Sequence, residues 1–173
     1  MLSYLWEENM KTLLFVVIVL WPVEALACSC FQPSVQRALT SADAVFTGEA
    51  VEVQYVDRVG DMFFGEKRII VTVKVSEYWK GNIQETMKLH TVYNRISCGG
   101  YFFKKGGKYI IYAYKGKAKD WLASQERRPQ LRGIGLPRQD DDIWSTSICT
   151  RTIELSGAGE DLKELGQSKI PSK

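Results

Sequence analysis

The sequence predicts a mainly β protein, a small closed barrel with short flanking helices. Residues 68–79 alternate apolar and polar side chains with the period of two that a strand requires. Further stretches rich in β-branched and aromatic residues follow at short spacing, and only short segments show helical features. Five strands of this kind suit the oligonucleotide/oligosaccharide-binding barrel, the OB-fold.

The expected elements follow one another along the chain. A short helix is predicted first, over residues 34–42. Its residues Val35, Ala38 and Leu39 fall on one side, as the helical period requires. The strands are predicted at residues 44–55, 68–79, 86–93, 108–114 and 145–154, and a last short helix at residues 160–165.

The composition of residues 115–142 predicts a long loop. The segment contains several arginines, glycines and prolines, and it ends in an acidic run, Asp140 to Asp142. Three consecutive carboxylates are one way to bind calcium, but they more often form a solvated turn. The solvated turn is therefore the expectation here.

Residues 1–27 are predicted to be a secretory signal peptide. Lys11 supplies a short basic region, residues 13–23 form an apolar run of eleven residues, and Ala27 precedes the cleavage point. A membrane-spanning helix needs about 20 apolar residues, so this run is too short to cross a membrane. Cleavage after Ala27 makes Cys28 the first residue of a secreted, extracellular protein, or of a periplasmic or cell-surface protein if the source is bacterial.

The mature chain is mildly basic. Without Lys11 and the three glutamates of the signal peptide it keeps 22 basic and 17 acidic residues, a net charge of +5. No basic face with interleaved aromatic residues accompanies this charge, so no nucleic-acid partner is predicted. A membrane is expected as a partner only if Cys28 is lipidated. Against lipidation, Leu26 is bulky where a lipoprotein signal has a small residue.

All four cysteines, Cys28, Cys30, Cys98 and Cys149, lie in the mature chain. An even number of cysteines behind a secretion signal predicts two disulfides. Cys28 and Cys30 are poorly placed to bond each other, so each should reach a distant partner. Cys28 pairs with Cys98 and Cys30 with Cys149, or the crossed pairing forms, and spacing alone does not choose. Either arrangement ties the N-terminus to the body of the protein, with about 4 kcal/mol from each loop closure.

The sequence offers no residues that converge on catalysis, so neither an enzyme nor a cofactor is predicted. The single histidine, His90, lies within an expected strand, where a structural role is the expectation. Zinc peptidases of the usual helical motif need paired histidines. The serines have no obvious base, and the cysteines are expected in disulfides. A structural zinc site is not expected, because the cysteines lack Cys-x-x-Cys spacing.

The predicted N-terminus has a chemistry of its own. A free α-amino group has a pKa of about 7.7 to 8.0, so a substantial fraction is neutral at physiological pH and able to ligate a metal. The amine and carbonyl oxygen of Cys28 would close a five-membered ring on the ion and displace the water of a catalytic zinc. Disulfides from Cys28 and Cys30 would hold this end still before the metal arrives. Simple pinning of a frayed chain end is the alternative role for the two bridges.

Three stretches resemble the tissue inhibitors of metalloproteinases. Residues 28–53, CSCFQPSVQRALTSADAVFTGEAVEV, share with that family the Cys-x-Cys start, an early proline, and a short helix that leads into the first strand. Residues 97–113, SCGGYFFKKGGKYIIYA, resemble its cysteine-glycine segment and Gly-Lys-Tyr strand, and residues 145–150, STSICT, resemble its next cysteine. The match spans most of residues 28–155 in order. Family members carry a third disulfide in this domain, for which this chain lacks the cysteines.

The resemblance implies a netrin-like OB-fold domain over residues 28–156, followed by a helix or tail over residues 157–173. It also implies the pairing Cys28–Cys98 and Cys30–Cys149. The protease contacts that it implies are Cys28, Ser29, Cys30, Phe31, Ser97 and Cys98. Among them, the amine and carbonyl of Cys28 chelate the zinc of the target, and the Ser29 side chain points into the adjoining specificity pocket.

The loop between the first two strands, about residues 56–66, is a further expected contact, because Met62, Phe63 and Phe64 make it apolar. The predicted function is that of a secreted inhibitor whose partner is the catalytic domain of a zinc metalloproteinase. The alternative is a netrin-like protein-binding module that does not inhibit and that is anchored by lipid if Cys28 carries it.

Overall fold

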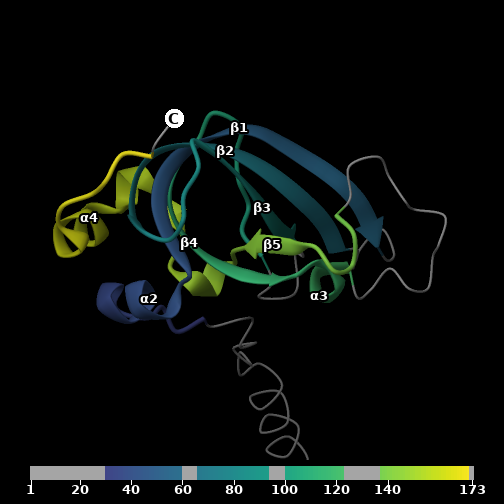
Figure 1. Cartoon of the computed structure of the whole chain (residues 1–173), viewed down its shortest axis with the longest axis horizontal. Coiled ribbons are helices and arrows are strands. Elements are labelled where there is room, and N and C mark those ends of the chain that lie inside the picture. The colour runs from purple at the N-terminus through teal and green to yellow at the C-terminus, as the bar shows by residue number, and fades with distance from the viewer. Residues whose placement is uncertain (1–29, 60–65, 94–99, 123–136, 172–173) are drawn as a thin grey trace, which may run out of the picture.

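The chain folds into a closed five-stranded β-barrel with short helices packed against it, shown in Figure 1 as a computed structural model. The structure describes residues 30–59, 66–93, 100–122 and 137–171. Within these ranges the strands are β1 (Ala44–Val59), β2 (Glu66–Lys80), β3 (Thr86–Tyr93), β4 (Lys108–Lys117), β5 (Asp142–Ser145) and β6 (Ile153–Glu154).

The hydrogen-bonded order of the strands is β1-β2-β3-β5-β4, with the short β6 beside β4. A further antiparallel pairing, between the first half of β1 and β4, closes the barrel. The pairing of β3 with β5 is parallel, and the other pairs are antiparallel. A closed, mixed, five-stranded barrel with short helices fits the OB-fold, so the predicted fold class is confirmed.

β1 and β2 form a longer antiparallel pair than the sequence predicted. β1 continues to Val59, which lies opposite Glu66 at the start of β2. The connection predicted over residues 56–66 is therefore restricted to residues 60–65, which lie outside the described residues together with the apolar side chains predicted there. The register shifts at four points, and Gly48 adjoins one of them. A Cβ at Gly48 would come within 2.6 Å of the Lys74 carbonyl oxygen, so glycine permits the strands to curve together.

The interior of the barrel is filled by alternate residues of its long strands. The alternation that predicted β2 is confirmed, because Ile69, Val71 and Val73 are fully buried. Each such side chain contributes about 1.5–3 kcal/mol when it leaves water. Other members of this core are Phe46, Leu89, Phe103, Tyr109 and Ile111.

A second apolar cluster joins the two predicted terminal helices to the outside of the barrel. These helices are α2 (Val35–Ser41) and α4 (Gly159–Leu165). Ser34 caps α2 by accepting a bond from the Arg37 amide, and Ala38 is fully buried. Beyond α4, the backbone of Lys169 exchanges two hydrogen bonds of 2.8 Å with Tyr78 of β2.

In the described part of the chain, no helix is both long and apolar enough to cross a membrane.

Two predictions for the second half of the chain were wrong. In the range predicted as a strand, residues 145–154, β5 ends at Ser145, a 3-10 helix (Ile148–Thr150) follows, and the short β6 comes last. Side chains of the segment bond its own backbone there, which ends the strand. The loop predicted at residues 115–142 is shorter, because β4 extends to Lys117 and the helix α3 (Ala118–Leu122) follows it.

Candidate functional site

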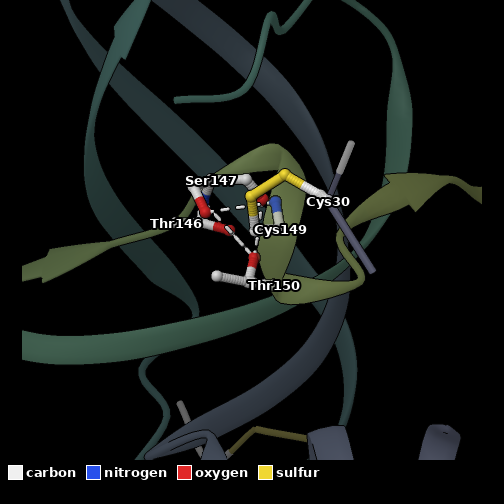
Figure 2. The surroundings of a disulfide bond; sticks show 5 residues. All are labelled: Cys30, Thr146, Ser147, Cys149 and Thr150. Atoms are coloured by element: carbon white, nitrogen blue, oxygen red, sulfur yellow. Dashed lines mark hydrogen bonds between the residues drawn. A yellow bond between two sulfur atoms is a disulfide. The ribbon is translucent and has the colours of Figure 1, made fainter. Parts of the chain in front are cut away.

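Two of the four cysteines lie in the described residues, and they are bonded to each other. Cys30 and Cys149 form a disulfide with their Cα atoms 5.2 Å apart and a sequence separation of 119 (Figure 2). This pairing is confirmed, and the crossed arrangement is excluded. Four other predicted contact residues lie outside the described ranges: Cys28, Ser29, Ser97 and Cys98. The Cys28–Cys98 bridge and the chelating amine therefore stay predictions.

Cys149, the partner of Cys30 in the disulfide, lies in a tight turn, residues 146–152, which we call the cysteine turn. Ser147 begins its 3-10 helix, and its hydroxyl oxygen accepts a bond of 3.2 Å from the Cys149 amide. In return, the Thr150 hydroxyl oxygen accepts from the Ser147 amide at 3.3 Å. This reciprocal capping satisfies backbone donors at the start of the helix and holds Cys149 in one orientation.

Three threonine hydroxyls of the cysteine turn lie within hydrogen-bond distance of one another. The oxygen of Thr146 lies 2.8 Å from that of Thr150 and 2.7 Å from that of Thr152. The same hydroxyls bond the backbone of Tyr112 in β4: the Tyr112 amide donates to Thr152 at 3.0 Å, and Thr146 donates to the Tyr112 carbonyl at 3.1 Å. A buried network with these partners restricts side-chain rotation, so the turn is attached firmly to the barrel wall.

The cysteine turn also holds the chain that follows the predicted contact residue Cys98. The Ile148 amide donates to the Gly100 carbonyl at 2.9 Å. Gly100 has a φ of +79°, and a Cβ there would overlap the carbonyl oxygen of Val92. Only glycine fits at this position. The turn is thus bonded to a residue of each predicted contact region, to Cys30 by the disulfide and to Gly100 by the hydrogen bond.

Apolar side chains stand exposed beside these attachment points. Phe31, next to Cys30, is 88% exposed, and Ile148, next to Cys149, is 38% exposed. Phe102, close behind Gly100, is 45% exposed. Along the chain, all three lie close to residues that the disulfide and the Gly100–Ile148 hydrogen bond hold together, or take part in that bond. Sequence reasoning singled out Phe31 but missed Ile148 and Phe102, whose only signal was their nearness to Cys149 and to the glycine pair.

No family model matches this chain, and no curated protein matches it.

A functional assignment therefore depends on the residues and geometry of this edge of the barrel. The described residues that belong to it are Cys30, Phe31, Gly100, Ile148 and Cys149. They combine a covalent attachment of the N-terminal segment with exposed apolar side chains, which is suited to contact with another protein.

The described residues include no group of three histidine, cysteine or acidic side chains that would hold a metal ion. His90 packs edge-on against Trp121 with ring centroids 4.9 Å apart, and burial lowers its pKa below 6.5, so the ring is neutral near neutral pH. In the acidic run, Asp142 forms an ion pair of 2.6 Å with Lys117, and Asp141 accepts from the Arg138 amide at 2.8 Å. These exposed contacts are those of a solvated turn.

A separate open hollow of about 670 Å³ lies at the turn before β4. Lys104, Lys105 and Lys108 line it, together with Glu154, which pairs with Lys104 at 3.2 Å. Three lysines against one glutamate leave the hollow positively charged. Its chemistry suits an acidic group of a ligand or of a partner protein.

Proposed function

We propose that the protein is a secreted inhibitor of zinc metalloproteinases that chelates the catalytic zinc of its target with its N-terminal amine and carbonyl. The observation that carries the proposal is the bridge from Cys30 to Cys149. It attaches the chain to the barrel directly behind Cys28, the predicted first residue. The proposal also draws on the resemblance of residues 28–53 and 97–113 to the tissue inhibitors of metalloproteinases.

The bridge supports chelation because it removes conformational freedom before the metal is bound. Fixing the backbone of one residue costs about 1–2 kcal/mol, so a chain end of several free residues would lose much of the gain from binding zinc. The disulfide fixes Cys30, two positions along the chain from the predicted amine, and the predicted Cys28–Cys98 bridge would fix Cys28 as well. The amine then meets the zinc already oriented.

The surroundings of the bridge support insertion into a protease cleft. Phe31 extends into solvent with 88% of its surface exposed, although an aromatic side chain of this size is usually buried. In the proposed complex, Ser29 enters the specificity pocket, Phe31 runs along the cleft, and Ser97 and Cys98 contact its opposite side. The Gly100–Ile148 hydrogen bond supports the placement of these two segments at one edge.

The decisive experiment shifts the N-terminal amine by one residue away from Cys28. The mature protein, beginning at Cys28, is titrated against a panel of zinc endopeptidases with a quenched fluorescent peptide as substrate. One alanine added before Cys28 should raise the inhibition constant at least about 100-fold, because the amine no longer shares a five-membered ring with the Cys28 carbonyl. The matched control carries the same alanine at the C-terminus, and circular dichroism checks that both variants fold.

Equal inhibition by the two extended proteins would refute the chelation mechanism. Mass spectrometry of the mature N-terminus provides an independent check, because a lipidated or otherwise blocked Cys28 has no free amine. Either result would leave the protein without the chemistry that the proposal requires.

The positively charged hollow favours the second candidate, a netrin-like binding module that does not inhibit. Lys105 and Lys108 line it on a turn far along the chain from Cys30. This candidate predicts that the panel of proteases is not inhibited and that the protein binds acidic partners with an affinity that falls as salt rises. Binding that depends on Lys105 and Lys108, together with absent inhibition, would select it.

A further inference from the structure

Arg151 ends the 3-10 helix of the cysteine turn in an unusual backbone conformation. Its φ of 68° and ψ of 8° are left-handed. Among the described residues it is the only one other than glycine with a positive φ. Such a conformation costs an L-residue about 1–2 kcal/mol, a cost that glycine avoids. The arginine side chain must therefore make interactions that offset the strain.

The guanidinium of Arg151 joins the cysteine turn to two other segments. Its Nε and Nη2 donate to the two carboxylate oxygens of Asp161 at 2.8 and 3.1 Å. Its Nη2 also donates to Glu160 Oε2 at 2.6 Å, and its Nη1 donates to the Pro33 carbonyl at 2.9 Å. A bidentate pair with a carboxylate fixes the plane of the guanidinium. Nη1 is consequently held in a set direction toward Pro33.

The carboxylate that orients Arg151 is itself attached to the barrel. Asp161 is 1% exposed, and its Oδ1 accepts a bond of 2.6 Å from the Tyr112 hydroxyl. Tyr112 is the β4 residue whose backbone bonds the threonines of the cysteine turn. The guanidinium therefore has a rigid base, and its bond to Pro33 is the one that reaches the N-terminal segment.

These contacts attach the N-terminal segment to the cysteine turn at two points. Cys30 is bonded to Cys149, and Pro33 accepts from Arg151, which follows Cys149 by two positions. Phe31 and the residue after it lie between the two attachments, and both are exposed. A chain held at one point is free to pivot about it, whereas a chain held at two separate points keeps one direction.

We propose that Arg151 is a positioning residue for the N-terminal segment that the structure describes, residues 30–33. Through its hydrogen bond to Pro33, it sets the direction in which this segment leaves the barrel. The consequence for inhibition rests on the proposed function, but the positioning itself is measurable with no protease present.

The test compares one substitution in this network with one outside it. Arg151→Met keeps an unbranched apolar stem and loses every donor of the side chain, including the one to Pro33. Tyr109→Phe removes a hydrogen bond elsewhere in the barrel, the one that the Lys104 amide donates to the Tyr109 hydroxyl at 2.8 Å, so it serves as the matched control for lost stability. Backbone ¹⁵N relaxation reports the order parameters of Phe31 and Gln32, thermal unfolding reports stability, and the protease panel reports inhibition.

In Arg151→Met the order parameters of Phe31 and Gln32 should fall from about 0.85 to below about 0.6. The inhibition constant should rise about 10-fold, since the segment must then be ordered on binding. Tyr109→Phe should change neither quantity, even where it lowers the melting temperature. If Arg151→Met does not fold, Arg151→Lys replaces it, because lysine keeps the charge near Asp161 but lacks the planar fork.

Unchanged order parameters in the folded Arg151 variant would overturn the proposal. Reduced order parameters with an unchanged inhibition constant would support positioning by Arg151 but overturn its consequence for inhibition, because the direction of the segment would then have no effect on binding. Reduced order parameters in a protein whose wild type inhibits no zinc endopeptidase would support positioning by Arg151 and reject the proposed function. The two ideas therefore fail in distinguishable ways.

Discussion

Removal of the Cys30–Cys149 disulfide by the paired substitutions Cys30→Ser and Cys149→Ser should lower the free energy of unfolding by about 4 to 5 kcal/mol. The bridge joins positions 119 apart, and closing a loop of that length in the unfolded chain is worth about 5 kcal/mol in the chain-entropy model. If the Cys28–Cys98 bridge also forms, the remaining loop is shortened to roughly half, and the value becomes about 4 kcal/mol.

Urea unfolding followed by circular dichroism measures this change, and thermal unfolding provides a second reading. For a chain of this size, a loss of 4 to 5 kcal/mol should lower the melting temperature by roughly 10–20 °C. The wild-type protein in reducing buffer is the control, and it should lose at least as much stability because every bridge is then open. A loss below about 2 kcal/mol, with the wild-type bridge verified by mass spectrometry, would refute the loop-closure reasoning.

Gly100→Ala should destabilise the protein more than Gly106→Ala, as urea unfolding will show. Both glycines have a φ near +80°, but a Cβ at Gly100 overlaps the Val92 carbonyl oxygen, whereas a Cβ at Gly106 meets no atom within 4 Å. The pH dependence of stability should carry the signature of His90. Burial lowers the pKa of its folded form below 6.5, so the free energy of unfolding should be level above pH 6.5 and should decrease as the pH falls below it.

Each of these two expectations has a clear contrary outcome. Equal losses in the two alanine variants would mean that the Val92 carbonyl moves aside without cost. His90→Gln should remove the decrease in stability between pH 6.5 and about 5, since His90 is the single histidine of the chain. A decrease that persists in this variant would have to arise from carboxyl groups instead.

The parts of the fold that the sequence predicted are those in which local pattern and burial agree. In β2, the alternation of Ile69, Val71 and Val73 appears in the sequence, and the same residues are buried in the barrel. The helix α2 carries its own start signal in Ser34. The prediction failed at residues 145–154, where a strand containing Cys149 was expected and the hydroxyls of Ser147 and Thr150 bond the nearby backbone instead.

The sequence by itself determined the β-rich fold class and the existence of cysteines placed to hold the N-terminal segment, because periodicity and cysteine spacing are local properties. It left the pairing of Cys30 open between Cys98 and Cys149 until a family resemblance suggested one answer. Only the tertiary structure decided that Cys30 bonds Cys149, that Gly100 adjoins Ile148, and that Arg151 reaches Pro33. These contacts join positions far apart in the chain, and they exist because closure of the barrel brings the cysteine turn against the N-terminal segment.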